Sequence, residues 1–226
     1  MASTVTKPIK LYVDFISQPA RAVVAFCKVN NIPHEIVEVR VFQYQQKTLE
    51  YTKINPLQKI PTMEEGDFRL SESHTIMRYL CNTKDVPDHW YPKKDLKKRS
   101  LIDLYLDWHH LNTRRCTWLI IANNFPGRDF QGNHFTLEEE TKFVNRTLKK
   151  IEEFFLKDKK YIFGDEMSIA DIAACSEIIQ LKMINFDFGP YPILEKWMER
   201  CFENQAMNEV NIVLFKILEK LNKPKL

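Results

Sequence analysis

The sequence predicts a small α/β domain followed by an all-helical domain. In the first 84 residues, short apolar runs typical of strands alternate with segments of helical periodicity. After residue 95, the segments repeat their apolar residues at helical spacing, and the stretch 85–94 holds two prolines and no periodicity. The chain has 226 residues, enough for two cores, and 5 glycines, a small number that favours helix. We therefore expect a first domain over 7–84, a linker over 85–94 and a helical domain over 95–226.

Local patterns define the elements of the first domain. They predict the order β-α-β-α-β-β-α, with strand 9–16, helix 17–33, strand 34–40, a polar segment 44–54 that is helical at best, a hairpin about Gly66 and helix 71–84. Pro19 lies near the start of the first helix, and Pro33 prevents that helix from continuing. Ser71 and Ser73 can cap the last helix through their hydroxyl groups.

The second domain is expected to contain helices alone. They are one long helix 95–123, a helix 136–157, a helix at MSIADIAA, and two more at roughly 191–202 and 205–222. In MSIADIAA, Ser168 and Asp171 form a capping box, in which each side chain accepts from a backbone N–H of the other's turn. Met167 and Ile172 are placed as the accompanying hydrophobic staple.

Composition and charge narrow the function classes. A formal net charge of +3 is too small to indicate a nucleic-acid-binding protein, which concentrates lysine and arginine far more heavily. The longest apolar stretches are shorter than the roughly 18 residues of a membrane span. Because the N-terminal segment contains no apolar leader, we expect a cytoplasmic protein without a membrane partner. The five cysteines are well separated and form no CxxC pair, which indicates reduced, buried thiols and argues against a zinc site.

Ser17 stands where the first strand passes into the first helix. A hydroxyl group at this point lies near the positive end of the helix and can donate to an anion such as a thiolate, whose ionised form it favours. Spacing alone favours the simpler interpretation that Ser17 caps the helix. No GxSxG motif or paired histidine supports a nucleophilic serine.

Two further motifs are candidates for ligand binding. In Lys59-Ile60-Pro61, a cis bond before proline would turn the backbone of Ile60 towards a ligand, although an ordinary strand-edge proline explains the same residues. Glu72 and Ser73 open the third helix, where amide groups and a hydroxyl suit a carboxylate and the glutamate suits an ammonium. The pair could thus hold a zwitterionic α-amino acid, and a simple helix cap is the alternative.

Taken in this order, five segments closely resemble the theta class of cytosolic glutathione S-transferases: SQPARA, INPLQKIPTM, GDFRLSES, VPDHWYP and the Ser-Ile-Ala-Asp box. The resemblance runs from residue 9 to residue 222. It implies a thioredoxin-like N-terminal domain, an all-helical glutathione transferase C-terminal domain that binds the electrophile, and a homodimer with a glutathione site on each subunit. Glutathione is then a co-substrate, and neither a cofactor nor a metal is implied.

The resemblance also implies residue roles. Ser17 matches the serine that stabilises the glutathione thiolate. The other glutathione-binding positions are the cysteinyl-backbone site at Lys59, Ile60 and a cis Pro61, the γ-glutamyl site at Glu72 and Ser73, and the glycyl-carboxylate site at Gln46 and Lys47. Gln46 departs from the family, which usually has histidine there. Glutamine donates a hydrogen bond but carries no charge, so the affinity for the carboxylate is in question.

Arg114 resembles the arginine that reaches the glutathione sulfur in theta enzymes, with Leu111 and Trp118 about one turn to either side in the electrophile pocket. A guanidinium there would lower the pKa of the thiol from roughly 8.5 by attraction of opposite charges. Alternatively, Arg114 is solvated and pairs with Asp107 or with a neighbouring helix.

The implied reaction is attack by the glutathione thiolate on a small hydrophobic electrophile such as an alkyl halide or an epoxide, with hydroperoxide reduction as a further detoxification activity. A non-catalytic glutathione- or ligand-binding protein on the same fold is the main alternative. A redox enzyme would need a cysteine at the head of the first helix, where Ser17 stands; Cys27 lies well inside that helix. Residues 222–226 look too short and polar to cover the active site, so we expect an electrophile pocket open to solvent.

Overall fold

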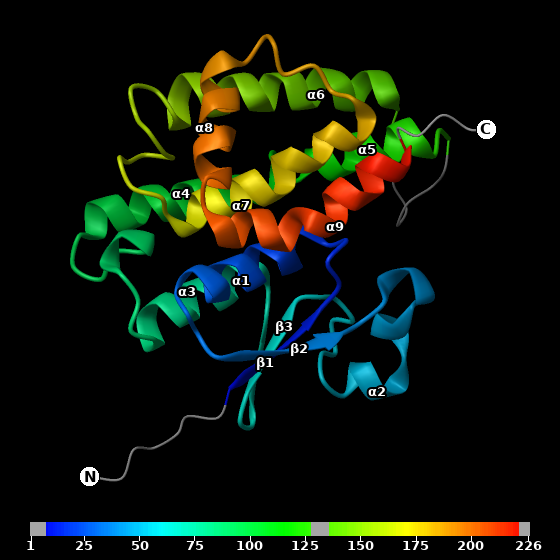
Figure 1. The fold of residues 1–226 in the computed structure, drawn as a ribbon, viewed down its shortest axis with the longest axis vertical. Helices are drawn as coiled ribbons and strands as arrows, with labels where there is room; N and C mark the ends of the chain where they lie inside the picture. The colour runs from blue at the N-terminus through cyan, green and yellow to red at the C-terminus, as the bar shows by residue number, and fades with distance from the viewer. Residues whose placement is uncertain (1–7, 128–135, 222–226) are drawn as a thin grey trace.

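A computed structural model describes residues 8–127 and 136–221 of the chain (Figure 1). In the first domain the elements are β1 Ile9–Val13, α1 Gln18–Val29, β2 His34–Glu38, α2 Leu49–Thr52, β3 Thr62–Glu65, β4 Phe68–Ser71 and α3 Ser73–Thr83. Two short 3-10 helices, Val41–Gln43 and Gln45–Lys47, precede α2. The predicted order β-α-β-α-β-β-α is confirmed.

The four strands form one sheet in the order β2-β1-β3-β4. β1 runs parallel to β2, and β3 is antiparallel to both of its neighbours. The register pairs Tyr12 with Thr62 across β1 and β3, and Thr62 with Ser71 across β3 and β4. The ends of β1, β2 and β4 and the start of β3 therefore lie at one edge of the sheet, which we call the exit edge of β1.

The helical domain contains α4 Leu96–Leu111, α5 Arg115–Asn124, α6 Leu137–Lys150, α7 Ile169–Ile178, α8 Pro192–Phe202 and α9 Gln205–Leu221. Short 3-10 turns cover Asp88–Trp90 and Ile179–Ile184, and the π-helical turn Ile151–Phe155 continues α6. Figure 1 shows α7 in the middle of this domain, with α1 and α3 between it and the sheet. Every residue of α7 is buried, and α7 packs against α1, α3, α4, α5 and α8. One core therefore joins the two domains.

The prediction of one long helix over 95–123 is wrong, because the structure divides this segment into α4 and α5. Asn112 leaves the helical conformation with φ −120° and ψ −77°, and its side-chain amide donates to the carbonyl of Trp108 at 2.9 Å. Thr113 turns into the core, where its hydroxyl lies 3.0 Å from that of Tyr105. This buried contact outweighs the helical periodicity of the segment.

The capping box at the start of α7 is confirmed. Oγ of Ser168 accepts from the amide of Ala170 at 3.2 Å, and Oδ2 of Asp171 accepts from the amide of Ser168 at 2.8 Å. The other carboxylate oxygen of Asp171 accepts from the amide of Ile162 at 2.8 Å and from the indole N–H of Trp197 at 2.9 Å. The carboxylate therefore caps α7 and also ties it to α8 and to the loop before α7.

The segment between the domains is packed against both of them. Trp90 and Tyr91 are buried, and the indole of Trp90 meets the ring of Phe26 in α1 edge-on, with 5.7 Å between centroids. The hydroxyl of Tyr91 donates to the carboxylate of Asp103 in α4 at 2.8 Å. These contacts hold α1 and α4, and with them the two domains, in a fixed relation.

Candidate functional site

Ser17 lies in the turn between β1 and α1, at the N-cap position of the helix. Its hydroxyl makes no capping hydrogen bond, so the interpretation of this side chain as a helix cap is wrong. The backbone is held on both sides, because the amide of Ser17 donates to the carbonyl of Asp14 at 2.9 Å and its carbonyl accepts from the amide of Arg21 at 3.0 Å. The half-buried Ser17 thus lies at the positive end of a 12-residue helix, and its hydroxyl does not cap that helix.

The Ile60–Pro61 peptide bond is cis. Within residues 8–127 and 136–221, neither the amide nor the carbonyl of Ile60 has a hydrogen-bond partner. The loop is held by the carbonyl of Lys59, which accepts from Oη of Tyr51 and Nδ2 of Asn55, both at 2.8 Å. Ile60 therefore offers an unused backbone donor and acceptor beside Pro61, as pairing with a peptide backbone requires.

Glu72 and Ser73 begin α3. Glu72 is exposed and occupies the N-cap position with φ 70°, a left-handed conformation that few residues other than glycine adopt. It makes no capping hydrogen bond, and Ser73 is already the first helical residue, so the expectation that serine caps α3 is wrong. Backbone strain of this kind persists where the surrounding structure holds it, and it is frequent at ligand-binding sites.

Gln46 and Lys47 lie in the 3-10 turns that follow β2. This segment is tied to the β1–α1 turn, because Oδ2 of Asp14 accepts from the amide of Val41 at 3.0 Å. Nε2 of Gln46 donates to the carbonyl of Val41 at 3.5 Å, whereas its Oε1 is buried without a partner in the described part of the chain. Nζ of Lys47 donates to Oε1 of Gln58 at 3.3 Å. Gln46 thus retains an unused polar atom at this edge.

The sheet register brings the predicted glutathione-binding positions to the exit edge of β1. Because Tyr12 pairs with Thr62, the cis proline just before Thr62 lies beside the residues that lead from β1 to Ser17. Because Thr62 pairs with Ser71, Glu72 leaves β4 at the same level. Three chain segments that are distant in sequence therefore bring the N-terminus of a helix, an open backbone pair and a carboxylate to one region.

Arg114 pairs with a neighbouring helix rather than with Asp107, the two partners that the sequence left open for it. Its Nη1 donates to Oε2 of Glu177 in α7 at 3.0 Å, and about a third of the side chain is exposed. Leu111, at the end of α4, is 78% exposed, and Trp118 in α5 is half-buried. The following residue, Arg115, turns the other way and pairs with Glu140 of α6. The two adjacent arginines therefore serve different helices.

A partly buried polar network that the sequence did not reveal connects Gln18 to Arg114. Nε2 of Gln18, the residue after Ser17, donates to Oγ1 of Thr117 in α5 at 2.7 Å. Thr117 donates in turn to Oε1 of Glu177 at 2.5 Å, and Nε2 of Gln180 donates to the same oxygen at 2.7 Å. The available signal was a glutamate inside the apolar segment IADIAACSEII, where a lone charge requires buried partners.

The cysteines and Tyr12 belong to the core. All five thiols are buried and unpaired, and burial raises the pKa of Cys27 to about 12, so this thiol stays protonated. Tyr12 is 8% exposed, packs edge-on against Tyr51 and hydrogen-bonds Glu64 at 3.4 Å. The Cys27 thiol is therefore not available as a nucleophile, and the Tyr12 hydroxyl is not available to donate a hydrogen bond to a thiolate.

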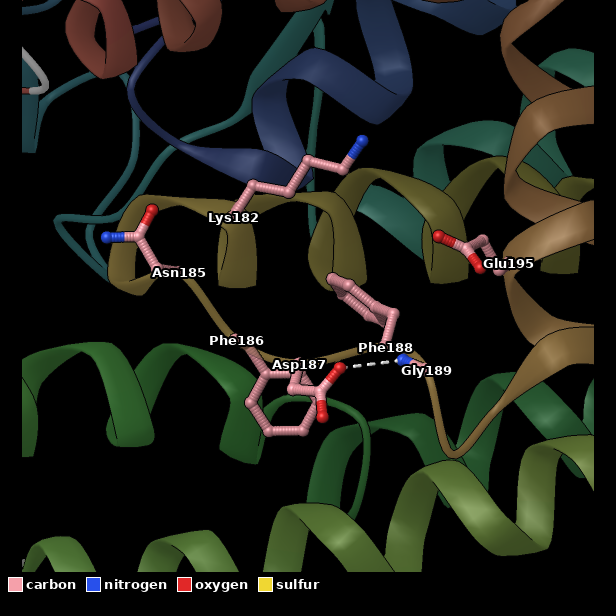
Figure 2. A pocket seen from close by; sticks show the side chains of 7 residues that line it. All are labelled: Lys182, Asn185, Phe186, Asp187, Phe188, Gly189 and Glu195. Atoms are coloured by element: carbon pink, nitrogen blue, oxygen red, sulfur yellow. Dashed lines mark hydrogen bonds between the residues drawn. The ribbon is translucent and has the colours of Figure 1, made fainter.

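A hollow of about 600 Å³ lies elsewhere, in the loop between the 3-10 turn Ile179–Ile184 and α8. Figure 2 shows its lining: Lys182, Asn185, Phe186, Asp187, Phe188, Gly189 and Glu195. Asp187 is engaged locally, because its Oδ1 accepts from the amide of Gly189 at 2.9 Å. None of the predicted site residues lines this hollow. Within the described residues, no group of three or more histidine, cysteine, aspartate or glutamate side chains is placed to hold a metal, and no helix is long and apolar enough to span a membrane.

Comparison with known proteins identifies the family. Residues 17–83 match the glutathione S-transferase N-terminal domain, and residues 117–205 match the glutathione S-transferase C-terminal domain. The chain is 35% identical to glutathione S-transferase T1 of Arabidopsis thaliana over 227 residues, which cover 95% of this chain and 92% of that protein. This chain belongs to the theta-class glutathione S-transferases. It is therefore a transferase enzyme, and the non-catalytic alternative is not supported.

Solved structures of theta-class transferases share the fold. The apo form of human glutathione S-transferase T1-1 superposes with a TM-score of 0.84 at 33% identity, covering 93% of this chain and 91% of the human chain. A human theta-class transferase in complex with the glutathione conjugate of 1-menaphthyl sulfate superposes with a TM-score of 0.85 at 32% identity, covering 95% and 90%. The predicted thioredoxin-like domain with a helical transferase domain is thus confirmed for this theta-class transferase. Residues 222–226, for which we expected no cover over the pocket, lie outside the described part of the chain.

Proposed function

We propose that the exit edge of β1 binds glutathione and that Ser17 stabilises its thiolate. The supporting observation is the Ser17 hydroxyl, which is fixed at the helix terminus and makes no capping bond. A hydroxyl donor and the positive end of α1 both favour the ionised sulfur. The catalytic contribution is a thiolate that is held in place and stays ionised near neutral pH.

The other residues of the edge bind the tripeptide. The open amide and carbonyl of Ile60 pair with the cysteinyl backbone beside the cis Pro61, and Lys59 holds this loop through its carbonyl. Glu72 accepts from the γ-glutamyl ammonium, while Ser73 and the start of α3 receive the α-carboxylate. Gln46 and Lys47 face the glycyl carboxylate, which Gln46 recognises by a neutral hydrogen bond.

The reaction transfers the thiolate to a small electrophile. With an alkyl halide, a carbon–sulfur bond forms as the carbon–halogen bond breaks, the halide takes the electron pair and the thiol proton passes to solvent. With an epoxide, the ring carbon–oxygen bond breaks and the alkoxide takes up a proton. With a hydroperoxide, two glutathione molecules are oxidised to the disulfide and the hydroperoxide is reduced to alcohol and water. These activities suit a detoxification enzyme.

The electrophile would lie between Leu111, Arg114 and Trp118. The 78% exposure of Leu111 supports a pocket open to solvent on that side. Arg114, whose side chain is about a third exposed, would add positive charge near the sulfur.

We further propose a cytoplasmic homodimer. Leu101 and Leu104 of α4 are 39% and 46% exposed and share one helix face, and Phe68 of β4 is 45% exposed. Exposed apolar side chains that recur along one face are typical of an interface. Reduced, buried cysteines fit the cytoplasm. Light scattering after size exclusion tests the dimer directly, and a monomer at micromolar concentration would contradict it.

The proposed function is tested with Ser17→Ala and a panel of one halide, one epoxide and one hydroperoxide. We expect glutathione-dependent turnover by the wild type and about a tenfold or greater loss in Ser17→Ala, because one pKa unit in the bound thiol is about 1.4 kcal/mol. Glutathione affinity should change less. Ser100→Ala is the matched control, since Ser100 is exposed on α4 and bonds its own helix. Wild-type turnover by Ser17→Ala at pH values below the thiol pKa would remove Ser17 from the mechanism.

A further inference from the structure

Arg21, in the first turn of α1, is completely buried. Its Nη1 donates to the carbonyls of Phe15 and Ile16 at 2.8 and 3.1 Å, the two residues immediately before Ser17. Its Nε donates to Oδ1 of Asn211 in α9 at 2.8 Å, and its Nη2 donates to the carbonyl of Ser176 in α7 at 3.1 Å. One side chain therefore ties the Ser17 turn to two helices of the other domain.

These four acceptors of Arg21 are all uncharged. In the described part of the chain no carboxylate lies within ion-pair distance of this guanidinium. Burial lowers the pKa of Arg21 to about 10, with the more distant charge of Glu177 acting in the opposite direction. The side chain therefore stays cationic at neutral pH, and its charge is not neutralised by an ion pair of its own.

Glu177 is the carboxylate whose charge acts on Arg21, and it already forms an ion pair with Arg114. Burial raises the pKa of Glu177, and the charge of Arg114 together with the Thr117 hydrogen bond opposes that rise. Two guanidinium groups thus share one carboxylate on the helical-domain side of the Ser17 turn. The cluster carries an excess positive charge, and its members Arg21 and Glu177 are fully buried, where charges act more strongly than in solution.

The Arg21 guanidinium lies against the backbone that leads into Ser17. The Ile16 carbonyl that Arg21 contacts belongs to the peptide group that continues into Ser17. Two charged residues of the described elements packed against α1 are engaged elsewhere: Glu209 of α9 pairs with Lys28 at 2.6 Å, and Arg78 of α3 pairs with Asp103 at 2.8 Å. Asp14 in the turn itself accepts from the amides of Ile16 and Val41. Neither His74 of α3 nor the buried Asp171 of α7 is among the hydrogen-bond partners of Arg21.

We propose that Arg21 is a positioning residue for thiolate formation: it holds the Phe15–Ser17 turn by hydrogen bonds and places an uncompensated positive charge against the backbone that leads into Ser17. This inference rests on the function proposed above. Part of the stabilisation of the glutathione sulfur then comes from the interior of the protein. Asn211 and Glu177 are the residues that set how much positive charge the sulfur experiences. Arg114 then modulates the sulfur from the electrophile side, and Arg21 from the side of the fold.

Two substitutions separate the charge of Arg21 from its packing. Asn211→Asp keeps an acceptor 2.8 Å from Nε and adds a negative charge, so it should raise the pKa of bound glutathione by about one unit, a tenfold loss of thiolate at low pH. Glu177→Gln removes the shared negative charge and should lower that pKa. Asn211→Leu is the neutral control and should leave the pKa near the wild-type value. The thiolate is measured by its ultraviolet absorbance in the binary complex from pH 5 to pH 9, with kcat and KM from the same samples.

Opposite shifts in Asn211→Asp and Glu177→Gln support the proposal, since loosening of the fold would move both variants the same way. Shifts of the same sign, or a shift in Asn211→Leu as large as in Asn211→Asp, would show that Arg21 acts through packing alone and would overturn it. Arg21→Lys keeps the charge while losing the forked backbone contacts, so it should retain most of the thiolate but raise KM for glutathione. A wild type without thiolate absorbance would refute the proposed function itself, which distinguishes the two failures.

Discussion

Arg114, the N-cap residue of α5, and Glu177 of α7 form an ion pair in which the Glu177 side chain is 1% exposed and the Arg114 side chain 32% exposed, with 3.0 Å between Nη1 and Oε2. One part of the Arg114 side chain therefore contacts the buried Glu177 carboxylate, and another part is exposed to solvent. A pair arranged in this way orients the arginine, and the two N–H groups of Nη2 can face a bound anion.

Arg114→Ala is expected to lower kcat about tenfold, which corresponds to about 1.4 kcal/mol in the barrier, because the positive charge beside the sulfur is lost. It should also lower the melting temperature, since a buried Glu177 is left without its cation. The double variant Arg114→Ala/Glu177→Gln recovers stability but not kcat. Steady-state conjugation kinetics and thermal unfolding of the same preparations measure the two effects separately.

Arg115→Ala provides the contrast. Arg115 pairs with Glu140, whose side chain is 1% exposed, and its guanidinium lies over the ring of Phe143 at 4.3 Å. We expect this variant to lose stability while the kcat per folded enzyme stays near normal. Equal losses of kcat in the two arginine variants would show that neither residue has a specific part in the reaction.

Gln46→His is expected to lower KM for glutathione severalfold with little change in kcat. Gln46 has a buried, unpartnered Oε1, and its amide offers the glycyl carboxylate a neutral donor. Histidine would offer a donor that can become charged in that contact, which strengthens the hydrogen bond. Glutathione titrations at pH 6.5 and pH 8 test this, because the gain should be larger at the lower pH. Gln43→His, on the exposed 3-10 turn before it, is the control. An unchanged KM would mean that the carboxylate lies elsewhere.

Asp171→Asn is expected to destabilise the protein by about 2–4 kcal/mol. The carboxylate accepts four hydrogen bonds, from the amides of Ile162 and Ser168, the Ser168 hydroxyl and the Trp197 indole. An asparagine amide would turn its own N–H groups towards two of these donors, and buried donors without acceptors cost about 1–3 kcal/mol each. Urea unfolding measures the loss. Asp187→Asn, which affects a single exposed loop contact, should change stability by less than about 0.5 kcal/mol.

The order of elements and the capping box followed from the sequence, because both rest on local patterns: apolar runs, prolines near helix ends and the Ser168–Asp171 spacing. The break between α4 and α5 did not, since its cause is a contact between Thr113 and Tyr105 inside the core. Spacing along one helix also cannot tell which helix a side chain meets. The spacing indicated that Arg114 and Arg115 face different directions, but not that they form ion pairs with Glu177 and Glu140.

The residues of the candidate site were predictable from the sequence, but the long-range hydrogen bonds that hold them in place were not. Ser17, Pro61 and Glu72 were found through motifs of the resemblance, yet each had a simpler structural explanation when taken alone. The sheet register removes that ambiguity for their location, since it brings all three to one edge. Gln18 and Arg21 stand inside the same SQPARA motif, but their long-range partners, Thr117 and Asn211, are separated from them by about a hundred residues or more, beyond the reach of any local pattern.

His74 makes the stability of this fold sensitive to acid. The side chain is 4% exposed, packs against the rings of His109 and His110 with centroid distances of 4.9 and 4.7 Å, and has an unpartnered Nδ1 within the described residues. Burial, followed by the charges of His110, Arg78 and Arg114, lowers the pKa of His74 to about 3. The folded ring is therefore neutral at pH values where the unfolded ring, with a pKa near 6.5, binds a proton.

Because the unfolded state takes up a proton that the folded state excludes, the free energy of unfolding falls as the pH drops from about 6.5 towards 3. His74 alone should account for a loss of about 2 kcal/mol between pH 7 and pH 5. In His74→Leu this part of the loss should disappear, so urea midpoints at the two pH values should lie closer together than in the wild type. Ile76→Val, a neutral and fully buried neighbour on α3, should lower both midpoints alike. If His74→Leu keeps the wild-type difference, the acid sensitivity arises from other groups, of which the buried His109 is the first to test, because burial lowers its pKa well below the usual range as well.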